Sequence, residues 1–295
     1  MQDPEKTNIV TRKVPFEFPE DIHPHWTPSA PEFAQMWNGF SLTMPYLEPF
    51  LIRTMREGMD KVAHPSTRAD AAGFMAQEGQ HYQMHQRFNS VLKQSYPDLQ
   101  AIEDDMKRFY KALGRKSLAR RLAYSAGFES MTLGVTRFLI GERRSLFAGA
   151  DTRVVSFWLW HMVEETEHKT AAFDVYQEAC GGYFTRAIGV FHGSWGVFYP
   201  GLRAAILMLK KDGMWQHWRT RWRLLKEVAR FARFVGPYLL RSTLPGHDPR
   251  FEEDLEWVSE YQQRYPDGVT AEAPPLVDTN DPDIPVPEMR FKTAA

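Results

Sequence analysis

The sequence predicts an all-α protein whose central part is a bundle of four long helices. Three observations support this fold class. Apolar residues recur at helical spacing over stretches of about 30 residues, and no convincing run shows the alternation expected of a strand. Proline- and glycine-containing breaks separate these stretches. A helix of this length spans about 45 Å, which fits a large four-helix bundle.

The predicted elements follow one another in a simple order. An irregular, Pro-rich N-terminal arm occupies residues 1–31, and the bundle occupies residues 32–182. Pro45 and Pro49 predict kinks in the first helix, or the restart of a helix. The predicted helices lie at residues 32–61, 67–95, 96–113, 117–146 and 151–181. The third of these is shorter and more charged than the others, so the remaining four are the bundle helices.

Additional helices are predicted to pack on the bundle over residues 183–265. The apolar run at 187–209 is long enough to cross a bilayer, but His192 and Arg203 would make a membrane span costly. A buried helix that covers the bundle is the favoured interpretation. The Pro-rich composition of residues 266–295 predicts a poorly ordered tail.

Residues 214–234 interleave tryptophan and phenylalanine with arginine and lysine. This pattern is typical of a helix that lies on an anionic membrane surface or docks a partner. An amphipathic helix packed on the same domain, with basic side chains reaching to solvent, explains the pattern equally well. The sequence therefore leaves open a peripheral membrane contact, and it leaves open a homodimer.

Composition limits the class of protein. A chain of 295 residues with 43% hydrophobic residues can bury a large core. The net charge of −1 argues against nucleic acid as a partner. Cys180 is the one cysteine, so an internal disulfide is not expected, and the first residues lack the pattern of a secretory signal. These features predict a cytoplasmic protein, with membrane association if 214–234 binds lipid.

Carboxylates and histidines occur in the helices with the spacing of metal ligands. Ferritin-like di-metal proteins use one glutamate from each of two helices and a Glu-x-x-His motif from each of the other two. Residues three positions apart share a helix face, so both side chains of such a motif can bind one ion. This sequence contains one such set in order, with one contribution from each predicted bundle helix: Glu48, Glu78-x-x-His81, Glu129 and Glu165-x-x-His168.

Each candidate ligand has a simpler explanation that must be weighed. An isolated Glu-x-x-His often lies on a helix surface, but two motifs on separate long helices favour a site. Glu129 lies in a stripe of small and apolar residues, where an unpaired carboxylate is costly; a buried salt bridge is the alternative. Glu48, shortly after Pro45, could interact with the helix dipole, but its apolar helical neighbours favour an inward orientation.

Three further residues are candidates for the layer around the ligands. Gln77 and Glu164 each precede a Glu-x-x-His glutamate and lie beside the ligand stripe. We expect Glu164 to bond His81, and Gln77 to bond His168, which would fix the orientation of each imidazole. His85, one turn beyond His81, is expected to reach the site or its mouth. Ordinary hydrogen bonding in the core is the alternative for all three.

The segments that carry these residues resemble a known family. "FPED", "LTMPYLEPFLIRTMRE", "QEGQHYQMHQRFN" and "WHMVEETEHKTAAFDVY" are similar to the bacterial family called predicted metal-dependent hydrolases, over about residues 10–260. Members of that family resemble ferritin-like proteins. The pattern His161-x-x-x-Glu165-x-x-His168 is also similar to di-iron arylamine N-oxygenases, which implies His161 as a seventh ligand. A buried histidine bonded to a neighbouring helix is the alternative for His161.

The ligand set favours particular metals and reactions. A site rich in carboxylates and poor in histidine favours two divalent ions, iron first, with manganese or zinc as alternatives. The leading prediction is a di-iron oxygenase or oxidase that uses O₂ and a small organic substrate, with the electron donor left open. The alternative is a two-metal hydrolase with a bridging hydroxide. Metal storage, or a structural metal site without turnover, is the second alternative.

Overall fold

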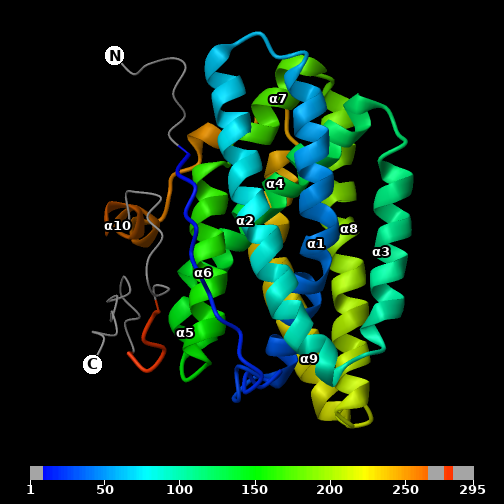
Figure 1. Ribbon diagram of the computed structural model, residues 1–295, viewed down its shortest axis with the longest axis vertical. Helices are drawn as coiled ribbons and strands as arrows, with labels where there is room; N and C mark the ends of the chain where they lie inside the picture. The colour runs from blue at the N-terminus through cyan, green and yellow to red at the C-terminus, as the bar shows by residue number, and fades with distance from the viewer. Residues whose placement is uncertain (1–8, 265–275, 282–295) are drawn as a thin grey trace.

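The computed structural model describes residues 9–264 and 276–281, and within these residues every regular element is a helix. This confirms the all-α class. Figure 1 shows the long helices lying along the longest axis of the molecule. The α-helices are α1 (Pro31–Met59), α2 (Pro65–Ser95), α3 (Leu99–Leu113), α4 (Leu118–Gly141), α5 (Arg143–Phe147), α6 (Thr152–Glu167), α7 (Ala171–Ala179), α8 (Tyr183–Lys211), α9 (Trp218–Ser242) and α10 (Glu256–Arg264), and η1 (Pro249–Phe251) is a 3₁₀ turn.

Four of these helices surround a common interior. α1 packs against α2 and α4, and α4 packs against α6. Side chains of α2 form hydrogen bonds with side chains of α6, as between His81 and Glu164, so the four helices close a ring. They belong to the predicted bundle segment, whose middle portions face one another. Polar and charged side chains are buried in the middle of this ring.

Helix α1 continues through both of its prolines. Pro45 cannot donate the helical hydrogen bond to the carbonyl of Ser41. The side-chain amide of Asn89, on α2, donates to that carbonyl at 2.9 Å instead. A side chain from the neighbouring helix thus supplies the donor that the proline lacks, and Glu48 lies in the middle of an unbroken helix.

Two of the predicted bundle helices are divided. The segment predicted as one helix over 117–146 is α4 and then α5, because the poor helix former Gly141 ends α4. The segment predicted as one helix over 151–181 is α6 and α7, with a turn at residues 168–170. His168 stands at this break with φ −103° and ψ 14°. Its ring is bonded to Gln77 on α2, and we attribute the break to this tertiary contact, which overrides helix propensity.

Helix α8 covers α1 and α4 from outside. A Cβ on Gly127 of α4 would lie 2.2 Å from the carbonyl of Gly189, so only glycine allows the two backbones to approach this closely. The sequence favours a buried helix over 187–209, and the structure shows that α8 buries one face on the bundle while its other face is exposed. That face follows helical spacing and carries the large side chains Phe184, Ile188, Phe191, Trp195 and Tyr199. Among the helices of the described residues, none combines the length and apolar character that a bilayer crossing needs.

The irregular N-terminal arm is anchored in the core. Over residues 9–30 it carries no helix, but Phe16 and Trp26 are buried. Most of the predicted tail at 266–295 lies outside the described residues. Its described portion, 276–281, lies near the start of α6, where the backbone N–H of Val277 donates to Ser156 Oγ at 2.8 Å.

Candidate metal centre

All ten candidate residues of the sequence lie buried in one place, between α1, α2, α4 and α6. None exposes more than 3% of its surface. α1 contributes one of them, α2 four, α4 one and α6 three, and the last follows the end of α6. In that order they are Glu48; Gln77, Glu78, His81 and His85; Glu129; His161, Glu164 and Glu165; and His168.

The candidate ligands form two adjoining groups whose donor atoms converge. One group consists of Glu78, Glu129, Glu165 and His168, and one donor atom of each lies within 4.8 Å of the others. The same limit holds for Glu48, Glu78 and His81, and for His81, His161 and Glu165. Glu78 and Glu165 therefore each belong to both sides of the cluster. This is the arrangement in which two carboxylates can bridge two ions while the other residues bind one ion each.

Several donor atoms in the cluster lack a partner. No hydrogen-bond partner exists among the described residues for either carboxylate oxygen of Glu48 and Glu78, for Oε1 of Glu129, or for Nδ1 of His81. Buried polar atoms without partners cost several kcal/mol of folding free energy, and native proteins avoid them. Unpaired atoms from three helices that face one another fit metal ions, which would supply the missing partners.

The charges of the cluster also favour bound metal ions. Burial raises the pKa of the Glu48 and Glu129 carboxyls well above the usual range, and nearby carboxylates raise them further. Burial also raises the pKa of Glu165, but His168 and His161 outweigh it, so the net pKa of Glu165 lies well below the usual range. Four ionised carboxylates in this space would repel one another, and bound cations would offset this repulsion. Two divalent ions would balance their four charges.

The histidines of the two Glu-x-x-His motifs each form a hydrogen bond on the side away from the cluster. His81 Nε2 lies 3.0 Å from Glu164 Oε2, and this places Nδ1 toward the carboxylates. His168 Nδ1 lies 2.9 Å from Gln77 Oε1, and its Nε2 lies 3.1 Å from Glu165. These are the two pairs expected from the sequence. Because each outer partner occupies one ring nitrogen, the other nitrogen of each ring faces the cluster.

Arg12, which the sequence analysis did not identify, connects the two outer partners. Its guanidinium contacts Glu164 Oε1 at 3.4 Å and both oxygens of Glu167 at 2.7 and 2.9 Å. Glu167 also accepts a hydrogen bond of 2.7 Å from Gln77 Nε2. Arg12 lies in the irregular arm, where no periodicity marks an inward residue. Glu167 points away from the ligand stripe of α6, which is why neither residue could be found by helical spacing.

His161 and His85 form a second line of contacts. His161 Nε2 lies 2.8 Å from Glu165 Oε1, and its Nδ1 lies 2.8 Å from His85 Nε2. His85 Nδ1 in turn lies 2.7 Å from the hydroxyl of Ser41 on α1. Burial, helped by the positive charge of His81, lowers the pKa of His161 to about 4. A neutral imidazole therefore faces the cluster, and one of its two ring nitrogens carries no proton, as metal binding requires.

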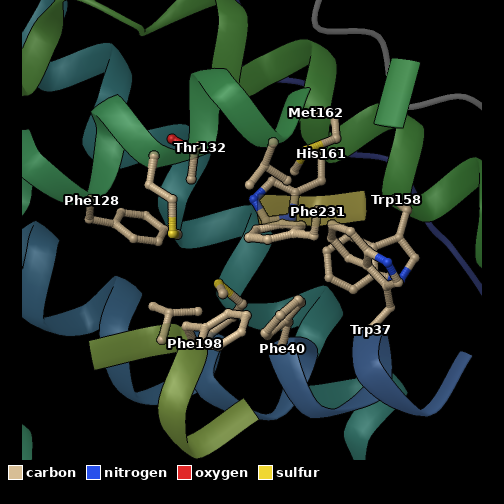
Figure 2. Close-up of a pocket in the computed structure, with 13 residues that line it drawn as sticks. Trp37, Phe40, Phe128, Thr132, Trp158, His161, Met162, Phe198 and Phe231 are labelled. Carbon is tan, nitrogen blue, oxygen red and sulfur yellow. The ribbon is translucent and has the colours of Figure 1, made fainter. Parts of the chain in front are cut away.

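A small apolar cavity adjoins this side of the cluster. Its volume is about 40 Å³. Figure 2 shows the ring of His161 among aromatic and aliphatic side chains that line it, including Trp158 and Phe231. Thr132 is a second polar residue of the lining, and its hydroxyl donates to the backbone carbonyl of Glu129 at 2.9 Å. The cavity thus reaches two residues that contact or belong to the cluster, and its remaining walls are apolar.

Comparison with known proteins gives one match. A family model described as "Predicted metal-dependent hydrolase" matches residues 10–253, which include every residue of the cluster and Arg12. No curated protein and no solved structure matches the chain. The family resemblance seen in the sequence is confirmed. Since the match covers most of its length, the chain belongs to the family of predicted metal-dependent hydrolases.

Proposed function

We propose that this protein is an enzyme with a carboxylate-bridged pair of divalent metal ions at the centre of a ferritin-like four-helix bundle. Glu48, His81 and His161 would bind one ion, and Glu129 and His168 the other. Glu78 and Glu165 would bridge them. The observation that carries the proposal is the convergence of unpartnered, fully buried carboxylate oxygens from α1, α2 and α4 on one space.

The donor set favours iron or manganese. Four carboxylates and three imidazoles are hard and intermediate ligands, and thiolates are absent from the cluster. Zinc in proteins usually takes four ligands, often with cysteine, and fits a shared site with seven candidate ligands less well. Iron is therefore the first metal to test, and manganese the second.

The walls of the cavity support an oxidation as the reaction. When bound, a pair of ferrous ions supplies the capacity to activate dioxygen for the oxidation of an organic substrate. The side chains of the protein would exclude water, because Trp158, Phe231 and their neighbours leave an apolar space beside His161. Glu164 and Gln77 would hold the ligand imidazoles in fixed orientations. An apolar substrate portion beside His161 would lie next to the metal pair.

Hydrolysis is the second candidate, and the description of the family favours it. In this reaction the metal pair would supply a hydroxide and polarise a carbonyl or phosphoryl oxygen. His161, which lines the cavity, would bind one of the ions here as well, because burial keeps its imidazole neutral. The cavity offers few polar groups that would orient a charged substrate, and this favours oxidation over hydrolysis.

Metal analysis combined with oxygen uptake tests the proposal. The protein is purified, its metal content is measured, and metal-free protein is loaded anaerobically with Fe²⁺ before exposure to O₂. About two irons per chain and O₂ consumption with a change in visible absorbance are expected. Tightly bound manganese or zinc, with turnover of esters or phosphate esters and no O₂ uptake, would establish the hydrolase instead. Metal uptake without any turnover would indicate storage or a structural site.

Two matched variants make the metal analysis specific. Glu129→Gln removes a ligand charge and is expected to reduce the stoichiometry toward one ion per chain. Glu57→Gln is the control, since Glu57 lies on α1 but its half-exposed side chain pairs with Arg121 outside the cluster. Equal metal content in both variants and the parent protein would contradict the proposed ligand set.

A further inference from the structure

An apolar groove lies on the outer surface between α8 and α9. Its volume is about 420 Å³. Large apolar side chains line it, among them Phe191 and Trp195 of α8 and Val235 and Leu239 of α9. The lining also contains Ser194, whose hydroxyl already donates to the carbonyl of Val190 at 2.7 Å. The groove therefore offers apolar contact and little hydrogen bonding.

The groove adjoins the cavity beside the metal centre. Met131, Phe198 and Phe231 line both spaces. Figure 2 shows Phe198 and Phe231 on the cavity side, in the same lining as His161. These three side chains lie between the two spaces. If they rotate, the two spaces would join into one apolar passage. The passage would run from the surface to the cluster of candidate ligands.

The dimensions of the two spaces indicate the shape of an occupant. The inner cavity, about 40 Å³, has room for only a few atoms, whereas the outer groove is about 420 Å³. A polar or charged group in the passage would lose its hydration without gaining partners, so a hydrophilic substrate is disfavoured. The exposed fractions of Trp195 (60%) and Phe191 (53%) leave apolar surface at the mouth that an apolar ligand would cover.

We propose that the groove and cavity together bind the alkyl chain of an amphiphilic substrate. The chain lies between α8 and α9, its end enters the cavity beside His161, and its polar head stays in water at the mouth. This assignment rests on the proposed function for its chemistry, because it names the substrate class of the same metal centre. The binding itself does not depend on turnover and can be measured separately.

A variant that fills the groove tests the binding step. A Cβ built on Gly236, which lines the groove on α9, meets nothing within 4 Å, so Gly236→Leu places a side chain in open space without disturbing the core. Binding of palmitate to the full chain is measured by calorimetry. We expect saturable binding by the parent protein and at least tenfold weaker binding by Gly236→Leu. Gly141→Leu is the matched control, because its Cβ also meets nothing within 4 Å, at the end of α4, and Gly141 does not line the groove.

Cross-linking tests the path into the cavity. Hexadecanoic acid with a diazirine at its chain end is bound, irradiated, and located by mass spectrometry. Labels on residues of the inner cavity, such as Trp158, Met162 or Val135, are expected. Labels confined to the exposed Trp195 or to other surfaces would overturn the proposal. So would an absence of saturable palmitate binding, or a dimer that covers the groove and excludes palmitate.

The metal content separates this proposal from the proposed function. Palmitate binding is measured with metal-loaded and with chelator-treated protein, and the metals in the parent and both glycine variants are counted. Palmitate binding by a protein that takes up no metal would refute the metal centre and retain the groove as a binding site. Two metals per chain without palmitate binding would refute only the alkyl-chain assignment.

Discussion

Arg12 and Glu167 form a two-pronged ion pair at the back of the candidate metal centre, with contacts of 2.9 Å from Nη1 and 2.7 Å from Nη2. The pair links an otherwise irregular N-terminal arm to the end of α6. Arg12 contacts Glu167, which accepts a hydrogen bond from Gln77, the partner of His168. It also contacts Glu164, which is the partner of His81. One arginine thus contacts the support of His81 directly and the support of His168 through Glu167.

The first prediction concerns this arginine. Arg12→Leu leaves the buried Glu164 and Glu167 without their cation, and we expect a loss of about 3 kcal/mol in the free energy of unfolding. Because both imidazoles lose part of their support, metal affinity should fall by about 10- to 100-fold. Chemical denaturation and competition with a chelating dye measure the two effects. Arg250→Leu, which breaks a half-exposed ion pair with Asp174, should cost about 1 kcal/mol or less and leave metal affinity unchanged. Similar metal affinities for the two variants would refute the supporting role.

The spacing of the candidate ligands was predictable from the sequence, whereas the contact of the N-terminal arm with the centre was not. Two Glu-x-x-His motifs and two single glutamates identify inward faces because helical geometry relates position to direction. Glu164 and Gln77 follow from the same geometry, one residue before each motif. Arg12 reaches the centre through an irregular segment, for which spacing along the sequence does not determine direction in space.

The apolar periodicity also does not predict where the helices break. The apolar pattern continues from α6 into α7, so it predicts one helix, but contacts of His168 with Gln77 on another helix determine where the turn lies. The same limitation applies to α8. Its sequence is apolar on most sides, and only the packing of glycines such as Gly127 and Gly189 shows which face is buried.

The second prediction concerns pH. Burial and nearby carboxylates raise the pKa of Glu48 and Glu129 above the usual value. Burial lowers the pKa of His81, but hydrogen bonds to Glu164 and Glu78 outweigh it and raise the pKa to about 10, so the metal-free centre holds a proton on this imidazole at neutral pH. Groups with raised pKa stabilise the metal-free fold fully below their unfolded pKa values and lose this effect as pH rises through the folded ones. Metal binding must displace this proton, and affinity should therefore increase with pH.

Calorimetry in buffers of different ionisation enthalpy measures the protons released per ion. The increase in Tm caused by metal should be larger at pH 8 than at pH 6. Glu129→Gln removes a carboxyl group whose pKa is raised, and it should reduce the proton release. A metal affinity independent of pH between 6 and 8 would contradict the proposed ligands.

The third prediction concerns the packing of α8 on α4. Gly127→Ala would place a Cβ 2.2 Å from backbone atoms of Gly189, so α8 must shift, at a cost of about 1–3 kcal/mol. Gly79→Ala is the comparison. A Cβ at this position meets nothing within 4 Å, and alanine replaces a glycine within helix α2. It should stabilise the protein by about 0.5–1 kcal/mol. Thermal unfolding of both variants measures the difference in Tm. Equal Tm values would show that α4 and α8 do not pack as described.

The fourth prediction concerns the surface of α9. Trp218 (67% exposed) and Trp222 (51% exposed) stand among basic side chains, which are the exposed Arg219, Arg221, Arg223 and Lys226. This combination favours peripheral binding to an anionic bilayer, because the indoles can enter the interface while the cations approach the lipid phosphates. We therefore expect the protein to float with phosphatidylglycerol vesicles and not with phosphatidylcholine vesicles.

High salt tests the contribution of the basic side chains to this binding, and a double variant tests the contribution of the two tryptophans. Raising the salt concentration to about 0.5 M shortens the screening length and should release most of the protein. Trp218→Ala combined with Trp222→Ala should abolish flotation at physiological salt, while Phe251→Ala, which removes an exposed aromatic side chain outside α9, should not. Flotation that persists in the double variant would assign the contact to another surface. A parent protein that does not float would refute the membrane contact, and sedimentation of the purified protein would then test whether it forms a dimer.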